Sequence, residues 1–121
     1  LEGIILKPNM IIPGQDCSDQ SNEEEIAKKT IESLEKCVPL AVPGIMFLSG
    51  GQSEKQSTNN LNKINSLGSS KAWKLSFSYG RALQFSALQA WRGNPDNIIN
   101  AQEAYLSRAM ENSLACHDQN N

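Results

Sequence analysis

Lys7 closes a short apolar run and is the residue whose type and position best suit covalent chemistry. A lysine at the end of a buried strand is partly desolvated, and because desolvation disfavours the charged ammonium, some free amine is expected near neutral pH. A free amine attacks a carbonyl to form an imine, which accepts electrons when a neighbouring carbon–carbon bond breaks. By position alone, a solvated lysine or one paired with a carboxylate remains the commoner outcome.

A second candidate site follows the next apolar run, at Ser49, Gly50 and Gly51. Two successive glycines let the backbone approach a ligand closely, and N–H groups at the start of a following helix can hold a phosphate. An ordinary tight turn explains the same three residues equally well.

A third candidate follows the third apolar run, at Ser78, Gly80 and Arg81. An arginine at the start of a helix is electrostatically unfavourable unless an anion lies nearby. A surface ion pair is the simpler alternative for Arg81 alone.

The elements that must position these residues alternate between strands and helices. Apolar runs predict strands over 1–6, 42–48 and 73–77, and helices are expected from Ser21 to before Pro39 and over 53–65, 82–91 and 96–115, with a loop at 68–70. Strands that alternate with helices indicate βαβ units on a parallel sheet. The candidate residues then share the carboxyl edge of that sheet.

Helix starts and buried faces can also be read from the sequence. Ser21 and Glu24 fit a capping box, and Asp96 is placed to cap the last helix. Residues at helical spacing predict four buried faces: Ile26, Ala27, Thr30, Ile31 and Leu34; Leu61 and Ile64; Leu83, Ala87 and Ala90; and Ile98, Ala101, Tyr105 and Ala109. Trp73, Tyr79 and Trp91 are expected to be packing residues.

Composition excludes several classes of function. The net charge of −2, with both signs interspersed, gives no electrostatic footprint for nucleic acid or anionic lipid, and no apolar run is long enough to span a membrane. Cys17, Cys37 and Cys116 are far apart and form no metal-binding pattern with the single His117, so free thiols and no metal are expected. The chain begins without methionine or a secretory signal, as if inside a longer protein.

Taken together, the three strand ends favour one interpretation. Many (β/α)8 barrels build a phosphate site from the loops after strands 7 and 8, and the two glycine-containing turns suit that site. Lys7 then closes the strand before them.

The motifs resemble those of class I fructose-bisphosphate aldolases. Residues 1–10 (LEGIILKPNM) resemble the Schiff-base lysine motif of that family, and residues 47–53 (FLSGGQS) and 77–84 (FSYGRALQ) resemble its phosphate loops. Residues 60–62, 90–91 and 112–116 also match, so the resemblance covers essentially the whole chain.

The resemblance implies a (β/α)8 barrel that reversibly cleaves fructose 1,6-bisphosphate into dihydroxyacetone phosphate and glyceraldehyde 3-phosphate. By the match, Lys7 forms the imine with no metal or other cofactor; Ser49, Gly50, Gly51, Ser78, Gly80 and Arg81 hold a substrate phosphate. The family implies a cytoplasmic homotetramer with plastid forms in plants, and no nucleic-acid or membrane partner.

The chain is shorter than the family pattern requires. A whole barrel takes about 250 residues, so residues 1–121 are expected to be the C-terminal segment of one barrel domain, with its last three βα units and a C-terminal helix. The acid and base residues of the family and its closing tail are not among these residues, so the isolated chain is expected to be inactive and poorly stable. Two alternatives stay open: another imine-forming barrel enzyme, such as a transaldolase-like one, or a truncated, non-catalytic chain that only binds phosphorylated ligands or assembles with aldolase subunits.

Overall fold

The computed structural model describes residues 1–67 and 73–117. Its elements are, in chain order, β1 (Ile5–Leu6), α1 (Glu23–Cys37), β2 (Gly44–Phe47), α2 (Glu54–Ser66), β3 (Lys74–Phe77), α3 (Arg81–Trp91), a 3₁₀ turn η1 (Pro95–Asn97) and α4 (Ile98–Ala115). The loop predicted at 68–70 lies outside the described residues.

The strands form a parallel sheet, as predicted. β2 lies between β1 and β3, with Ile45 opposite both Leu6 and Leu75. Each strand is shorter than its apolar run. The clearest case is β1, because residues 1–4 form a turn in which the Ile4 N–H donates to the Leu1 carbonyl oxygen at 3.2 Å.

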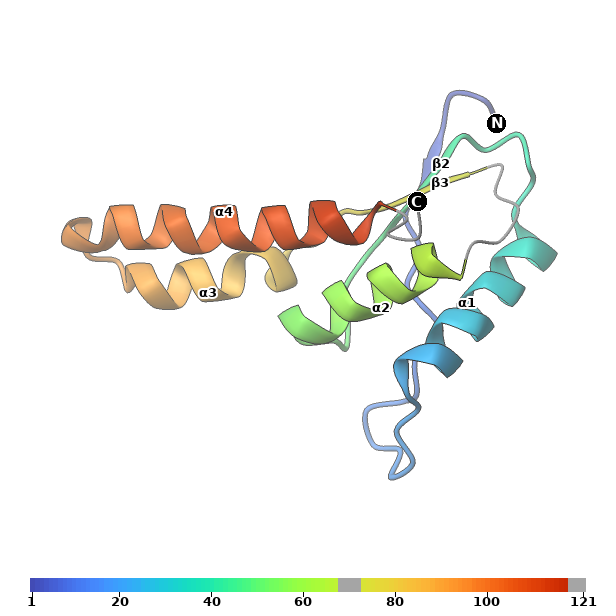
Figure 1. The fold of residues 1–121 in the computed structure, drawn as a ribbon, viewed down its shortest axis with the longest axis horizontal. Helices are drawn as coiled ribbons and strands as arrows, with labels where there is room; N and C mark the ends of the chain where they lie inside the picture. Colours follow the sequence, from blue (N-terminus) through green and yellow to red (C-terminus); the bar gives the residue numbers. More distant parts are fainter. Residues whose placement is uncertain (68–72, 118–121) are drawn as a thin grey trace.

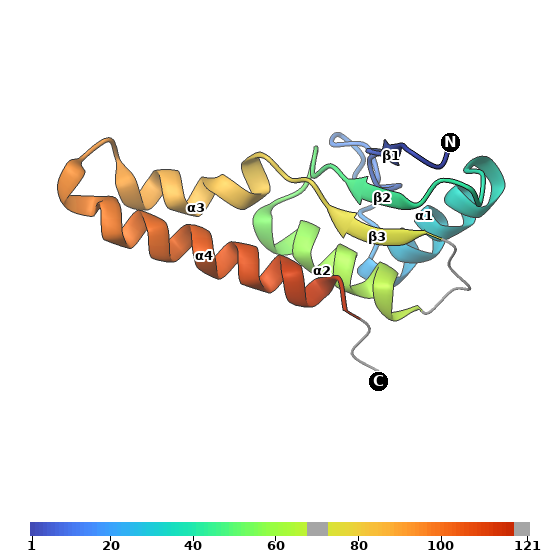
Figure 2. The ribbon, with the colours of Figure 1, turned by 90° about the horizontal axis from the view of Figure 1, so that it is seen from above.

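Helices α1 and α2 lie on the same side of the sheet (Figure 1, Figure 2). The face predicted for α1 is confirmed, since Ile26, Ala27, Thr30, Ile31 and Leu34 are all buried. Leu61 and Ile64 of α2 are buried too, and with Ile45 and Phe47 of β2 they are wholly inaccessible to solvent. The core therefore lies between the sheet and these two helices.

Two predicted helix caps are wrong. The cap of α1 is Asn22, whose side chain accepts from the Glu25 N–H at 2.9 Å, rather than Ser21. At the last helix, Asn94 caps η1 by accepting from the Asp96 N–H, and α4 begins after Asn97 without a side-chain cap. Serine, asparagine and aspartate all suit this role, so the sequence alone does not decide between neighbouring candidates.

Helices α3 and α4 form an antiparallel arm that extends away from the sheet (Figure 1, Figure 2). The face predicted for α4 is wrong, because Ile98 and Tyr105 are 45% and 42% exposed. The residues that α4 buries are Arg108, Asn112 and Ala115. The face predicted for α3 is only half-buried.

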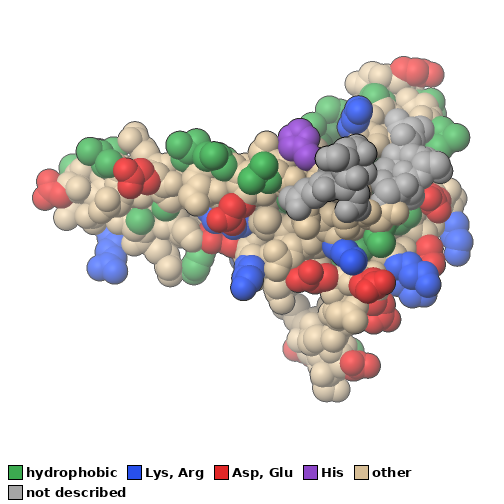
Figure 3. Space-filling model, viewed as in Figure 1, with side chains coloured by type: hydrophobic (Ala, Val, Ile, Leu, Met, Phe, Trp, Pro, Cys, Tyr) green, Lys and Arg blue, Asp and Glu red, His purple; other side chains and the backbone are tan. Residues whose placement is uncertain are grey.

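The arm leaves many large apolar side chains exposed, and Figure 3 shows such side chains along it. They are Phe85, Leu88 and Trp91 on α3, and Ile98, Ile99, Tyr105, Leu106, Met110 and Leu114 on α4. Trp91 is thus not the packing residue that was predicted. Trp73 is one, since it is buried and its Nε1–H donates to the Pro39 carbonyl oxygen at 3.0 Å.

Two further features concern the chain as described. The three cysteines are free thiols, as predicted. Among residues 1–67 and 73–117, none of the helices is long and apolar enough to cross a bilayer.

Candidate active site

The hydrogen-bond ladder of the sheet continues past the carboxyl ends of its strands. The Leu48 N–H donates to the Pro8 carbonyl oxygen at 2.9 Å, and the Ser78 N–H donates to the Phe47 carbonyl oxygen at 2.9 Å. These bonds place the residues after the three strands side by side at one edge of the sheet. Lys7 is adjacent to Pro8, and Ser49 is adjacent to Leu48.

A cavity of about 350 Å³ opens at this edge and is called the strand-end cavity here. Its lining includes every predicted site residue: Lys7, Ser49, Gly50, Gly51, Ser78, Gly80 and Arg81. Its size suits a small-molecule ligand, for which sites of about 300–1,000 Å³ are usual. Three residues that the sequence had not singled out complete the lining: Gln15, Leu48 and Gln52.

The backbone of the first glycine-containing turn requires glycine at its third position. The turn closes when the Gln52 N–H donates to the Ser49 carbonyl oxygen at 3.1 Å. Gly51 has a φ of +78°, and a Cβ there would lie 2.9 Å from Ile12 Cδ1. No side chain therefore fits at Gly51 without strain.

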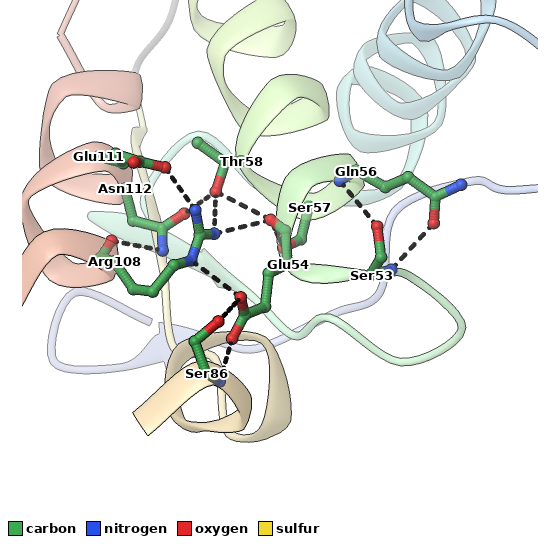
Figure 4. A network of polar contacts seen from close by, with 9 residues as sticks. All are labelled: Ser53, Glu54, Gln56, Ser57, Thr58, Ser86, Arg108, Glu111 and Asn112. Carbon is green, nitrogen blue, oxygen red and sulfur yellow. Dashed lines mark hydrogen bonds and ion pairs between the residues drawn. The ribbon is translucent and has the colours of Figure 1, made fainter. Parts of the chain in front are cut away.

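The starts of α2 and α3 differ in how their N–H groups are satisfied. In α2, Ser53 and Gln56 form a reciprocal capping box (Figure 4). In α3, Gly80 is the cap and provides no side chain, and the first turn contains no acidic residue. The N–H groups at the start of α3 can therefore bind an anion, and Arg81 adds a positive charge there.

Lys7 is exposed in the structure. The desolvation expected from the sequence is therefore wrong for the described residues. Within the described parts of the chain, neither Lys7 nor Arg81 forms an ion pair. Two cations without a carboxylate partner thus line the strand-end cavity, which suits an anionic ligand.

The segment after Lys7 is fixed against the core. Met10 is buried, and the Ile11 N–H donates to Oγ1 of buried Thr30 in α1 at 2.9 Å. The backbone that carries Lys7 is therefore held between β2 and α1.

Tyr79 fixes the segment between β3 and α3. Its hydroxyl donates to the Ser57 carbonyl oxygen at 2.9 Å, and its side chain is buried. Burial raises the pKa of Tyr79 above its ordinary value of 10.0, so the phenol stays protonated. The expectation that Tyr79 is a packing residue is confirmed.

Gln52 is the most firmly held of the three additional cavity residues. Its Oε1 accepts from Asn60 Nδ2 at 2.8 Å, and its Nε2 lies 3.6 Å from Met10 Sδ. Its place directly after the two glycines was the signal available in the sequence. Gln15 comes from a loop after β1 with no regular periodicity, so no pattern indicated it.

A larger hollow of about 540 Å³ lies elsewhere, between α1 and α2. None of the predicted site residues lines it, and Glu23 and Glu24 do, so it suits an anionic ligand poorly. In the part of the chain that the structure describes, no group of three His, Cys, Asp or Glu side chains is placed to hold a metal ion.

Comparison with known proteins gives a consistent result. The family model described as fructose-bisphosphate aldolase class-I (glycolytic) matches residues 1–121. The chain is 55% identical over 115 residues to "Fructose-bisphosphate aldolase 4, cytosolic" from Arabidopsis thaliana, a match that covers 95% of this chain and 29% of that protein. It is 53% identical over 116 residues to "Fructose-bisphosphate aldolase A" from Salmo salar, covering 96% of this chain and 32% of that protein.

A solved structure of fructose-bisphosphate aldolase from Plasmodium falciparum, in complex with TRAP and a small-molecule inhibitor, has the same fold over the matched part. Its TM-score is 0.89 at 47% sequence identity, and the match covers 93% of this chain and 32% of that chain. The chain thus spans about a third of the length of the relatives that it matches.

Proposed function

The chain belongs to the class-I fructose-bisphosphate aldolase family, and on that premise we propose that it is part of an enzyme that reversibly cleaves fructose 1,6-bisphosphate into dihydroxyacetone phosphate and glyceraldehyde 3-phosphate. The reaction serves glycolysis and gluconeogenesis. One observation carries the proposal: Lys7 and the two glycine-containing turns, at residues 49–51 and 78–81, line a single cavity.

Lys7 is the proposed nucleophile. Its free amine adds to the ketose carbonyl carbon, and uptake of one proton with loss of one water gives a protonated imine. The C3–C4 bond then breaks, its electron pair moves into the imine to form an enamine, and the C4 hydroxyl loses its proton as the aldehyde forms. Addition of a proton to C3, followed by hydrolysis, releases dihydroxyacetone phosphate and regenerates the amine.

The phosphate next to the reacting carbonyl is proposed to lie in the rest of the strand-end cavity. Ser49, Gly50 and Gly51 offer hydroxyl and backbone donors on one side. Ser78, Gly80 and Arg81 offer donors and a guanidinium on the other, where the start of α3 has no carboxylate of its own. The imine acts as the electron sink in this proposal, and no metal ion is required.

The architecture proposed for the longer protein is a (β/α)8 barrel. Residues 1–121 then form the C-terminal segment of a single barrel domain, supplying its last three βα units and a helix. The exposed apolar side chains of the arm and the two edge strands of the sheet support this proposal, because neighbouring barrel elements would cover them. A homotetramer in the cytoplasm, with plastid forms in plants, is proposed from the family and from relatives named cytosolic.

The exposure of Lys7 favours a second candidate for the 121-residue chain taken alone. Without neighbouring strands to desolvate the amine, and without the family's acid and base groups, the chain alone is proposed to bind phosphorylated ligands without cleaving them.

Cleavage of fructose 1,6-bisphosphate by the full-length protein tests the proposal, with Lys7→Arg compared with Lys74→Arg. Arginine keeps the charge but forms no imine under these conditions, so Lys7→Arg is expected to lower kcat by a factor of about 10⁴ or more. Lys74 is exposed at the opposite end of β3, so its replacement is expected to leave kcat unchanged. Equal activity in the two variants would exclude Lys7 as the nucleophile.

A further inference from the structure

A single group of hydrogen bonds and ion pairs joins α2, α3 and α4 (Figure 4). It is called the Glu54 cluster here and consists of Glu54 and Thr58 of α2, Ser86 of α3, and Arg108, Glu111 and Asn112 of α4. No residue of this cluster lines the strand-end cavity, yet the cluster begins three residues after Gly51.

The carboxylate of Glu54 takes both donors of Ser86. Its Oε1 accepts from the Ser86 backbone N–H at 2.7 Å, and its Oε2 accepts from the Ser86 hydroxyl at 2.5 Å. Ser86 is the sixth residue of α3, so a side chain of α2 is bonded directly to the backbone of α3. Two bonds to one carboxylate fix both the distance and the orientation of α3 relative to Glu54.

Arg108 holds Glu54 from the opposite side. Its Nη2 donates to the main-chain oxygen of Glu54 at 2.7 Å, and its Nε lies 3.6 Å from Glu54 Oε2, within ion-pair range. The Arg108 and Glu54 side chains are only 11% and 16% exposed. A charge pair this buried depends on the other hydrogen bonds of its members. Ser86 bonds to both carboxylate oxygens, whereas Arg108 Nε makes no hydrogen bond within the described residues.

Thr58 and Asn112 also bond to Arg108. The Thr58 hydroxyl accepts from Arg108 Nη2 and lies 2.7 Å from Asn112 Oδ1, to which it can donate its one proton. Asn112 Nδ2 donates to the Arg108 carbonyl oxygen at 3.0 Å. These contacts explain why α4 buries Arg108 and Asn112 rather than its large apolar residues.

The position of the cluster gives it a consequence for the strand-end cavity. Glu54 is the first residue of α2 and follows the turn that contains Gly51; Ser86 follows Arg81 by five residues in α3. A gap of about 250 Å³, lined by Gln52, Ser53, Glu54, Arg81, Ala82 and Phe85, lies between the starts of the two helices. Side-chain packing therefore does not fill the space between them, and the bonds of Glu54 to Ser86 bridge it.

We propose that Glu54 and Ser86 are positioning residues for the phosphate site: their paired hydrogen bonds set the distance between the turn of residues 49–52 and Arg81. The inference rests on the proposed function, because it takes that site to hold the phosphate next to the imine. Loosening the pair lets the two sides of the site move apart, which weakens the grip on the phosphate but leaves Lys7 in place.

Imine formation at Lys7 in the full-length protein separates phosphate binding from the placement of Lys7. Dihydroxyacetone phosphate and dihydroxyacetone share the reacting carbonyl, but only the former has the phosphate. For the wild type, Ser86→Ala and Glu54→Gln, we measure the concentration of each compound at which borohydride trapping of the imine is half-maximal. Glutamine can accept only one of the two Ser86 donors, because its amide nitrogen faces the other.

Both variants are expected to raise the half-saturating concentration of dihydroxyacetone phosphate about tenfold, as loss of one hydrogen bond to a charged group implies. Dihydroxyacetone is expected to show no change. Ser86→Thr, which keeps both donors, is expected to behave like the wild type. The double variant is expected to be no worse than the more severe single variant, because both remove the same contact.

Glu111→Gln is the matched control. Glu111 also pairs with Arg108 but, within residues 1–67 and 73–117, forms no hydrogen bond or ion pair with α3, and its side chain is 54% exposed. Its replacement removes one charge from the same arginine and is expected to leave both half-saturating concentrations unchanged.

Three results would overturn the inference. The variants could lose free energy of unfolding with no change in trapping, which indicates a purely structural role. They could weaken the binding of dihydroxyacetone phosphate and of dihydroxyacetone equally, which indicates displacement of Lys7. The wild type could fail to trap either ligand at Lys7, in which case the proposed function fails as well; a wild type that traps normally isolates the failure to the role of Glu54 and Ser86.

Discussion

Gly51 is the residue of the strand-end cavity whose replacement the backbone tolerates least. Gly51→Ala places a Cβ at a φ of +78° and 2.9 Å from Ile12 Cδ1, and the two effects together are expected to cost about 2 kcal/mol in free energy of unfolding. Denaturant unfolding of the full-length protein measures this cost.

Gly93→Ala separates the two effects. Gly93 also has a positive φ, of +71°, but apart from its chain neighbours no atom of the described residues lies within 4 Å of its Cβ position. Its replacement is expected to cost about 1 kcal/mol, the backbone part alone. Equal costs at the two positions would mean that Ile12 moves aside freely.

Tyr79 makes the stability of the protein depend on pH in alkaline solution. Burial raises the pKa of Tyr79 above its ordinary value of 10.0, which the unfolded chain retains. Below about pH 10 both states keep the proton, so Tyr79 contributes no pH dependence. Above it, the unfolded state loses the proton first, and the free energy of unfolding is expected to fall by about 1.4 kcal/mol per pH unit.

Tyr79→Phe is the test of that slope. The free energy of unfolding of the variant is expected to be about 1 kcal/mol lower near neutral pH, because the hydrogen bond to Ser57 is lost. Above pH 10, this free energy is expected to fall less steeply with pH than that of the wild type. Tyr105→Phe is the control, because Tyr105 is 42% exposed. If the Tyr79→Phe and wild-type profiles run parallel through pH 11, the phenol ionises freely and the burial argument is wrong.

At the scale of the elements, the start of α1 offers a direct comparison. Asn22 provides the side-chain cap and Ser21 provides none. Asn22→Ala is therefore expected to lower the free energy of unfolding by about 1 kcal/mol, and Ser21→Ala by less than about 0.5 kcal/mol. A larger loss for Ser21→Ala would restore the capping box predicted from the sequence.

The sequence predicted the parallel sheet and the inner helices because their signals depend on local apolar patterns. The faces of α1 and α2 are buried by the sheet, so apolar spacing alone locates them. The face of α4 was missed because its buried residues include Arg108 and Asn112, whose burial depends on Glu54 and Thr58, 54 residues away in the chain. No local pattern reports a partner at that separation.

The grouping of the candidate site residues around one cavity was predictable for a similar reason. Lys7, Ser49 and Arg81 follow separate apolar runs, and a parallel sheet brings the ends of such runs to one edge. Gln15 was not predictable, because it reaches the same cavity from an irregular loop. The exposure of Lys7 was not predictable either, since it depends on which strands flank β1.

At the scale of the whole molecule, the exposed arm and the exposed Lys7 have one explanation. The chain spans about a third of the length of its relatives, and the remaining barrel proposed for the longer protein covers both. The apolar side chains of α3 and α4 then become buried, and the amine of Lys7 becomes desolvated and more nucleophilic. The chemistry of Lys7 is thus expected to depend on the complete protein.

The most direct test of the account is to map the imine. The full-length protein and the 121-residue chain are each incubated with dihydroxyacetone phosphate and reduced with borohydride, and the modified peptide is identified by mass spectrometry, with Lys7→Arg as the control. We expect an adduct on Lys7 of the full-length protein, absent from the control and much reduced in the 121-residue chain. An adduct on another lysine of the full-length protein, or none, would contradict the assignment of Lys7 as the imine-forming residue.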